Sequence, residues 1–208
     1  MDKSYRTIEH SAVAEFIERR SRFIGYASPV TTEQQALDFI AQIRSKHWDA
    51  THNVYAYCLR EGQIRRYSDD GEPSGTAGVP TLDVILKSNL TDIVVVGTRY
   101  FGGVLLGAGG LVRAYSHSAS IAIEEAKIIT RSLCSFCKVA CEYNQYGKVS
   151  STVCDYGGVV DNSLFLDKVE VSFHIPCDNV NALNKALADV TCGEVKVEVE
   201  YQDFCTEK

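Results

Sequence analysis

The sequence predicts an α+β protein with two domains, and three observations support this fold class. The 208 residues, of which 45% are hydrophobic and 23% charged, suffice for one large core or two small ones. Stretches in which apolar and polar residues alternate, as in half-buried strands, lie between stretches of helical periodicity. This pattern changes near residue 130, so we expect domains of residues 1–130 and 131–208.

The front half mixes strands and helices. Thr32 followed by Glu33, Gln34 and Gln35 forms a capping box, and apolar residues then recur at helical spacing, which predicts an amphipathic helix over 33–46. Two polar, glycine-rich loops cover 68–78 and 102–110. The other predicted elements are strands at 13–17, 22–30 and 52–59, a strand that ends near residue 67, a helix at 80–88, a strand at 92–98 and a helix at 111–127.

The back half has a clearer periodicity, and its elements follow the order β-α-β-β-α-β. This order is typical of the ferredoxin-like fold, in which both helices cover one face of an antiparallel sheet. Asp178 is expected to cap the second helix. The predicted strands are 134–143, 158–163, 169–175 and 195–201, and the predicted helices are 146–156 and 180–190.

Charge restricts the classes of partner. The formal net charge is −6, from 21 Lys and Arg against 27 Asp and Glu. Residues 1–130 carry 14 basic and 15 acidic side chains, whereas the remainder carries 7 and 12. This distribution excludes a protein coated all over with basic residues for nucleic acid, but it allows a local basic patch on the front half.

The sequence shows no sign of secretion or membrane insertion. No window approaches the roughly 18 apolar residues of a membrane span, and the first ten residues contain no apolar block. We therefore expect a cytoplasmic protein that does not bind membranes. Its eight cysteines are expected to be free thiols in a reducing compartment.

The loop Ser68–Gly78 concentrates acidic, hydroxyl and glycine residues. Its carboxylates could hold a hard cation or act as acid and base. The alternative is a turn whose aspartates bond their own backbone and cap the next helix. The spacing of an EF-hand is absent, and we predict no metal site. The candidate residues of this loop are Asp69, Asp70, Glu72, Ser74 and Thr76.

The second loop has the order of an anion site: a buried strand, five glycines and a helix start. Free backbone N–H groups and the helix dipole favour negative charge there. The pattern is neither a P-loop nor GxGxxG. Alternatively, the glycines only permit tight packing, and Arg113 pairs with an acidic neighbour. The candidate residues for anion or partner binding are Arg99, Tyr100, Gly102, Gly103, Gly107, Gly109, Gly110 and Arg113.

Histidine and cysteine chemistry receives less support. His52 is a further candidate for the site, with a structural role as the alternative. On a strand, Cys134 and Cys137 would point to opposite faces, and Cys137 and Cys141 would lie roughly 13 Å apart, which does not fit zinc. No catalytic residue is assigned, and no cofactor is expected.

These same segments resemble the signature of the IMPACT family in its bacterial two-domain form. The resemblance covers essentially the whole chain. The front basic position is Arg where many members have Lys, and the cysteine-rich strand is not part of the family pattern. The residues that carry it are Arg20–Phe23, Ala50–Asn53, Ser68–Gly78, Thr98–Gly103 and Leu106–Tyr115.

The resemblance implies a front domain with the fold of the second domain of ribosomal protein S-five. It also implies a back domain similar to the last domain of elongation factor G. Eukaryotic relatives regulate translation, which suggests a non-enzymatic, translation-linked protein. Such a protein would bind RNA, a ribosomal component or a protein partner, without DNA sequence specificity. The alternative is an enzyme that acts on a phosphorylated small molecule or nucleotide at the same site.

The acidic charges of the first loop and the basic charges of the second would complement each other if both loops lay on one surface. Asp69, Asp70 and Glu72 would then face Arg99 and Arg113. They would either form ion pairs or flank a cleft for a phosphate and a metal ion. We expect at least one direct ion pair.

Overall fold

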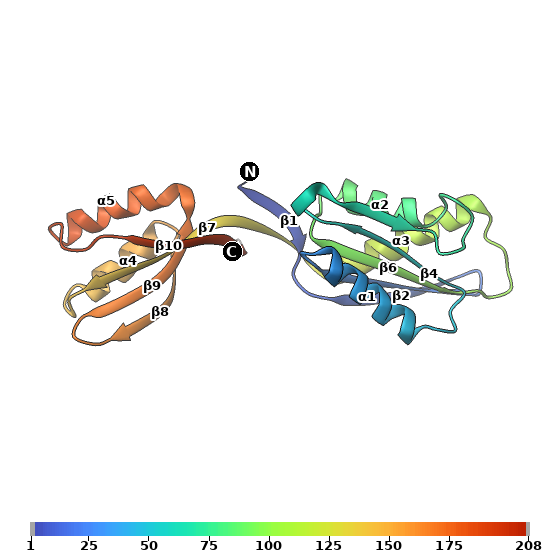
Figure 1. Cartoon of the computed structure of the whole chain (residues 1–208), viewed down its shortest axis with the longest axis horizontal. Coiled ribbons are helices and arrows are strands. Elements are labelled where there is room, and N and C mark those ends of the chain that lie inside the picture. Colours follow the sequence, from blue (N-terminus) through green and yellow to red (C-terminus); the bar gives the residue numbers. More distant parts are fainter. Residues whose placement is uncertain (1–2, 207–208) are drawn as a thin grey trace. The chain divides into compact units, whose positions relative to one another are not determined.

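The structure is a computed structural model that describes residues 3–206. The chain divides into two compact units (Figure 1). The N-terminal unit is Tyr5–Thr130, and the C-terminal unit contains residues 131–206 together with residues 3–4. None of the helices in the described part of the chain is long and apolar enough to cross a membrane.

An antiparallel five-stranded sheet forms the centre of the N-terminal unit. The strands lie in the order β2-β3-β6-β4-β5. Their bounds are β2 Ala12–Glu18, β3 Ser21–Pro29, β4 His52–Cys58, β5 Arg65–Ser68 and β6 Ile93–Tyr100. The central strand β6 is almost continuously apolar and buried because helices cover both faces of the sheet.

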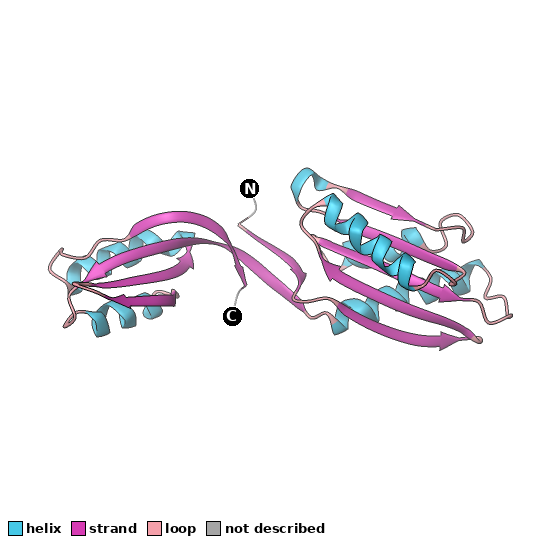
Figure 2. Ribbon diagram, turned by 60° about the horizontal axis from the view of Figure 1, so that its bottom comes forward, coloured by secondary structure: helices cyan, strands magenta, loops and turns pink. Residues whose placement is uncertain are grey.

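Helix α1 (Glu33–Lys46) covers one face of this sheet, and α2 (Gly78–Lys87) and α3 (Ala108–Glu125) cover the other (Figure 2). Ile40 packs with Val94 and Val96 on the first face. Because successive strand residues point to opposite faces, Val95 instead joins the helices of the second face. The predicted capping box of Thr32 and Gln35 is present at the start of α1.

One end of this sheet collects the motif segments, and we call it the loop end. There β2 turns into β3, β6 finishes opposite the first residues of β3 and β4, and β5 finishes. Helices α2 and α3 both begin at this end, at the right of Figure 1. The four connections that meet there are 19–20, 47–51, 69–77 and 101–107.

The C-terminal unit has the predicted order β-α-β-β-α-β, and its strands pair as β10-β7-β9-β8. All three pairings are antiparallel, which confirms the ferredoxin-like arrangement. Its own core contains Val171 and Phe173 from the sheet and Leu183 from a helix. The elements are β7 Ile128–Cys141, α4 Tyr146–Asp155, β8 Val159–Phe165, β9 Val169–Pro176, α5 Val180–Val190 and β10 Glu198–Thr206.

Three local expectations are corrected. A short strand that the sequence pattern does not predict, β1 (Ser4–Ile8), pairs with β7. Strand β7 begins at Ile128, before the predicted start at residue 134. Asp178 does not cap α5, whose preceding residue Asn179 forms no side-chain cap; Asp178 forms an ion pair with Lys3 instead.

Candidate functional site

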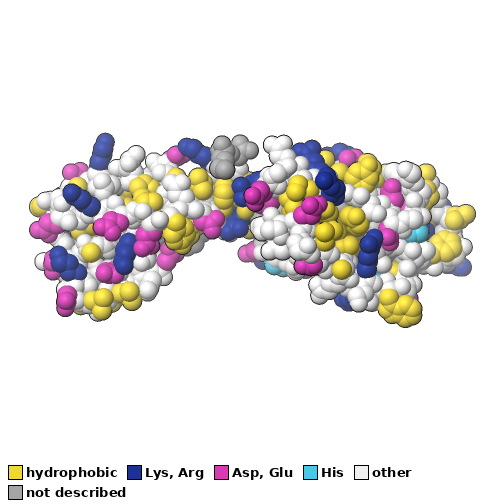
Figure 3. Space-filling view, viewed as in Figure 1, with side chains coloured by type: hydrophobic (Ala, Val, Ile, Leu, Met, Phe, Trp, Pro, Cys, Tyr) yellow, Lys and Arg dark blue, Asp and Glu magenta, His cyan; other side chains and the backbone are white. Residues whose placement is uncertain are grey.

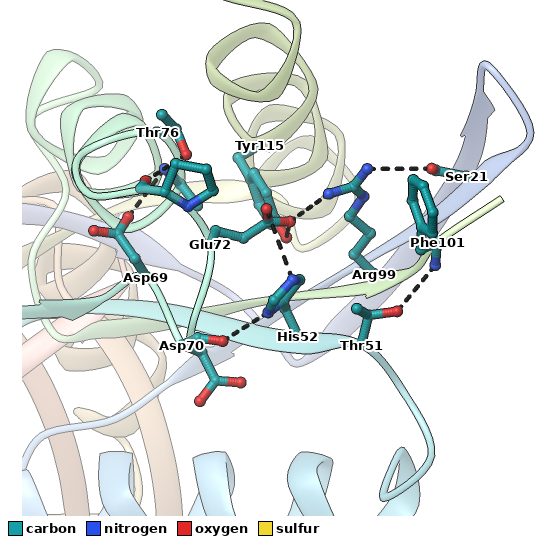
Figure 4. A network of polar contacts seen from close by, with 12 residues as sticks. Ser21, Thr51, His52, Asp69, Asp70, Glu72, Thr76, Arg99, Phe101 and Tyr115 are labelled. Carbon is teal, nitrogen blue, oxygen red and sulfur yellow. Dashed lines mark hydrogen bonds and ion pairs between the residues drawn. The ribbon is translucent and has the colours of Figure 1, made fainter. Parts of the chain in front are cut away.

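Glu72 is the centre of a buried polar cluster at the loop end (Figure 4). Arg99 Nη1 donates to Glu72 Oε1 at 2.7 Å, and the two side chains are only 6% and 3% exposed. The predicted convergence of the two glycine-rich segments is therefore present, through one direct ion pair. A carboxylate and a guanidinium this deeply buried stabilise each other only as a pair.

Two further side chains complete this Glu72 cluster. Tyr115 of α3 donates its hydroxyl hydrogen to Glu72 Oε1 at 2.8 Å. Burial raises the pKa of Tyr115, and the Glu72 carboxylate adds to this effect, so the hydroxyl remains a donor. His52 Nδ1 lies 2.7 Å from the carbonyl oxygen of Asp70, and its Nε2 lies 3.8 Å from Glu72 Oε2. Because a carbonyl can only accept, Nδ1 carries the hydrogen.

The other two acids of the loop bind elsewhere. Asp69 accepts backbone N–H groups from Gly75, Ala77 and Gly78, so it holds the loop closed and caps α2. Asp70 pairs with Arg44 of α1 at 2.6 Å and also accepts the backbone N–H of Asn53. The reading of this loop as a self-bonded, helix-capping turn is therefore correct for Asp69.

The connection 101–107 is fixed against the turn between β2 and β3. Ser21 Oγ accepts both Gly102 N–H and Arg99 Nη2–H. A Cβ atom on Gly102 would lie 2.0 Å from the backbone of Arg20, so only glycine fits there. Arg19 and Arg20 form a two-residue turn with φ angles of 46° and 69°. Such turns normally contain Asn-Gly, because left-handed backbone is unfavourable for arginine.

The first turn of α3 is exposed and uncapped. It follows Gly107, which has a φ of 72°, and no side chain caps it. Arg113 is exposed and forms no ion pair among the described residues, so the expectation that it faces the acids is wrong. Its guanidinium reaches back to the first turn, with Nη1 4.0 Å from the Cβ position of Gly109. A hollow of about 260 Å³ lies between this turn and β2.

The predicted site residues therefore fall into two groups, with Tyr100 outside both. Arg99, Glu72, Asp69, Asp70, Thr76 and His52 hold the loops together inside the domain. Tyr100 points to the opposite face of the sheet, where its hydroxyl contacts His47 and Asp49. The residues that stay accessible are Ser74, Gly103, Gly107, Gly109, Arg113 and, in part, Gly102 and Gly110.

Several residues of the loop end were not among the candidates. Arg19 and Arg20 are exposed at the turn, and Phe101, Leu105 and Trp48 are 46%, 80% and 83% exposed. Figure 3 shows hydrophobic and basic side chains next to each other at this end of the N-terminal unit. Exposed apolar side chains beside cations would have been a usable signal, but only once the strands that carry them are known to finish at one end.

The described residues contain no group of three or more histidine, cysteine or acidic side chains that could hold a metal ion. Cys137 and Cys141 are buried in the core of the C-terminal unit, and burial raises the pKa of the Cys137 thiol to about 11. None of the eight cysteines forms a disulfide.

The fold and this site define a two-domain α+β protein whose N-terminal domain gathers its motif loops at one end of a sheet. Residues 19–123 match the family described as the Impact N-terminal domain, and residues 139–194 match a domain of unknown function, DUF1949. The chain is 38% identical over 192 residues to the IMPACT family member YvyE of Bacillus subtilis, covering 92% of this chain and 88% of that protein. The chain belongs to the IMPACT family.

Other relatives show how far the similarity extends. The IMPACT family member YigZ of Escherichia coli is 31% identical and covers 86% of this chain and 89% of its own. Protein IMPACT of Bos taurus is 32% identical but covers only 52% of this chain and 35% of its own length. A crystal structure described as a hypothetical protein matches 97% of this chain and 99% of its own, with a TM-score of 0.62 and 28% identity.

Proposed function

We propose that this chain is a non-enzymatic, translation-linked protein that binds RNA through the loop end of its N-terminal domain. One observation carries the proposal. The carboxylates of the motif loop are all used inside the domain, whereas three arginines at the same end remain exposed. Asp69, Asp70 and Glu72 bind backbone groups, Arg44 and Arg99, respectively. Arg19, Arg20 and Arg113 face solvent.

The neighbouring apolar side chains fit the same ligand. Phe101 is 46% exposed; its backbone N–H donates to Thr51 Oγ1, and the N–H of the following Gly102 donates to Ser21 Oγ. Proteins that bind single-stranded nucleic acid combine cations that follow the phosphates with aromatic rings on which bases stack. Trp48, in the connection 47–51 of the same end, offers a second ring. Two acids lie at the same end. The Glu18 carboxylate lies 4.0 Å from Arg19 Nε, an exposed contact of little energetic weight, and Asp49, beside Trp48, accepts the hydroxyl hydrogen of Tyr100.

The use of the acids gives no support to the alternative function, an enzyme that acts on a phosphorylated small molecule or nucleotide. Such an enzyme needs a free carboxylate as a base or as a magnesium ligand beside the phosphate. Both oxygens of Asp69 accept backbone hydrogen bonds, and Glu72 is paired with Arg99. The relation to translation rests on the resemblance to the eukaryotic members of the family.

The test is a filter-binding titration of a hairpin RNA with a single-stranded loop, repeated at several salt concentrations. Phosphate contacts release counterions, so affinity falls as salt rises, with a slope of about 0.7–0.9 per contact in the logarithmic plot. The double variant Arg19→Gln/Arg20→Gln is expected to lower this slope by about 1.4–1.8.

A matched control is available in the same unit. Arg65 and Arg66 are an adjacent pair of exposed arginines on the edge strand β5, paired with the part of β4 that lies away from the loop end. The variant Arg65→Gln/Arg66→Gln removes the same charge and is expected to keep the slope. RNA binding that is absent at every salt concentration, or that is weakened equally by both variants, contradicts the proposal. Binding of a protein in place of RNA would do so as well.

A further inference from the structure

The hollow beside α3 has two walls that the fold brings together. On β2, Phe16 and Glu18 lie two residues apart and point to the same face, and Arg19 follows at the turn. The other wall is one face of α3, on which lining residues follow one another at intervals of three or four positions: Gly110, Arg113, Ala114 and His117. Leu106 closes the hollow beside Gly110, and a Cβ on Gly110 would lie 3.0 Å from the Leu106 Cβ.

One side of this hollow is apolar, and another side is cationic. Phe16, Leu106 and Ala114 give it an apolar side, and Phe16 is held in place by stacking on Phe23 at 5.2 Å. Arg19 and Arg113 give it a cationic side, and His117 also lines it, with its ring 4.6 Å from the ring of Phe16. This combination suits a ligand that has an anionic group and an apolar ring.

Charge indicates which anion fits. Arg19 and Arg113 contribute two positive charges, Glu18 removes one, and the nearby start of α3 adds about half a charge. The sum is about +1.5. A phosphodiester inside a strand carries a single negative charge, whereas a terminal phosphate monoester carries about −1.5 to −2 at neutral pH. The monoester therefore neutralises the hollow, and the diester leaves positive charge behind.

Size indicates how much of the ligand enters. The volume of about 260 Å³ lies below the roughly 300–1,000 Å³ of pockets for drug-sized molecules. It has room for one phosphate and part of one nucleoside. From these observations we infer that the hollow binds the terminal phosphate of an RNA strand, with the first sugar or base against Phe16 and Leu106. This inference rests on the proposed function and makes it specific for strand ends.

The test uses RNAs of one sequence that carry a 5′-phosphate, a 3′-phosphate or only hydroxyl ends. Each phosphorylated RNA has a fluorescent label on its other end and is compared with the hydroxyl form labelled at that same end. Fluorescence anisotropy measures binding to the whole protein. Hydrogen bonds to charged groups predict that one phosphorylated form binds about tenfold or more tightly than the hydroxyl form. In Arg113→Gln this ratio is expected to approach one. Because Arg113 is exposed, thermal unfolding should be unchanged. Arg65→Gln should keep the ratio of the unmodified protein.

The outcomes separate the two proposals. Equal, salt-dependent binding of all three RNAs overturns the end-binding pocket and leaves RNA binding in place. No binding of any RNA overturns the proposed function. Adenosine monophosphate serves as the free-nucleotide probe. If it binds in an Arg113-dependent manner while no RNA binds, the hollow is a small-molecule site, and both RNA proposals are wrong. A ratio that survives Arg113→Gln places the terminal phosphate elsewhere and overturns the pocket assignment.

Discussion

Glu72 shows how a single residue connects distant parts of the chain. It belongs to the acidic loop, yet its carboxylate is the acceptor for Arg99 of β6 and Tyr115 of α3. The Nε atom of Arg99 has no hydrogen-bond partner among the described residues, so the Glu72 contact is its main compensation for burial. Removing the carboxylate would leave an uncompensated guanidinium in the interior.

We therefore predict that Glu72→Gln lowers the free energy of unfolding by about 3 kcal/mol or more. Urea denaturation followed by circular dichroism measures this change. The double variant Glu72→Gln/Arg99→Met should recover part of the loss, because it removes both buried charges together. If Glu72→Gln alone lowers the free energy of unfolding by less than about 1 kcal/mol, solvent reaches the Glu72–Arg99 pair and the prediction is wrong.

His47 provides a second prediction at this scale. Its ring is buried between the hydroxyl groups of Tyr26 and Tyr100. Burial, together with the charges of Lys46 and Arg22, lowers the pKa of His47 below the ordinary value of 6.5. The unfolded chain therefore binds a proton before the folded one does as pH falls. The stability contributed by neutral His47 is complete above pH 6.5 and decreases as pH falls through the folded-state pKa.

The variant His47→Gln should accordingly lose less stability than the unmodified protein when the pH is lowered from about 7.5 to 5.5. Unfolding in urea at each pH measures the difference. The other histidines are present in both proteins, so their contributions cancel in the comparison. Identical pH dependence in the two proteins would contradict the assignment.

At the residue scale, the sequence allowed one ion pair between the loops to be predicted, but not which one. Arg99 is selected because it stands opposite His52 in the β4–β6 register and on the face that α3 covers. Arg44, the partner of Asp70, lies 26 residues earlier on helix α1, and no local pattern connects the two. Tyr115 is part of the quoted motif, but its role depends on the side of the sheet on which α3 packs.

Secondary structure elements were more predictable than their contacts. Strict alternation over residues 169–175 and the capping box before α1 correspond directly to β9 and α1. Strand β1 was missed because Ser-Tyr-Arg-Thr-Ile has little alternation, and it becomes a strand through its pairing with β7. The early start of β7 was missed for the same reason: residues 128–133 gain a strand partner only in the folded chain.

At the scale of elements, Asp69 is predicted to act as a remote cap for α2. This helix starts after Ala77, which has no capping side chain of its own, so Asp69 supplies the acceptor for the N–H groups of Ala77 and Gly78. Asp69→Ala should lower the free energy of unfolding by about 1–2 kcal/mol. Asp83→Ala, an exposed acid on the same helix, should change it by less than about 0.5 kcal/mol. Equal effects in the two variants would rule out the capping role.

At the scale of the whole molecule, each unit has a separate hydrophobic core. Leu183 of α5 is fully buried in the core of the C-terminal unit, and Leu→Ala changes at such positions typically cost 2–5 kcal/mol. We expect Leu183→Ala to accelerate amide hydrogen exchange in β9 while leaving β6 of the N-terminal unit protected. Equal acceleration in both strands would show that the two units unfold as one.

The left-handed turn of Arg19 and Arg20 also restricts which substitutions can be used to raise the thermal stability of the protein. Asn-Gly at these two positions would relieve the strain in the backbone, and an engineer who selects for thermostability would choose it first. The same exchange would delete two of the three exposed arginines, Arg19, Arg20 and Arg113, on which the RNA proposal rests. If the RNA proposal is correct, stability and binding are opposed at this turn. Consensus-guided stabilisation should then exclude these two positions.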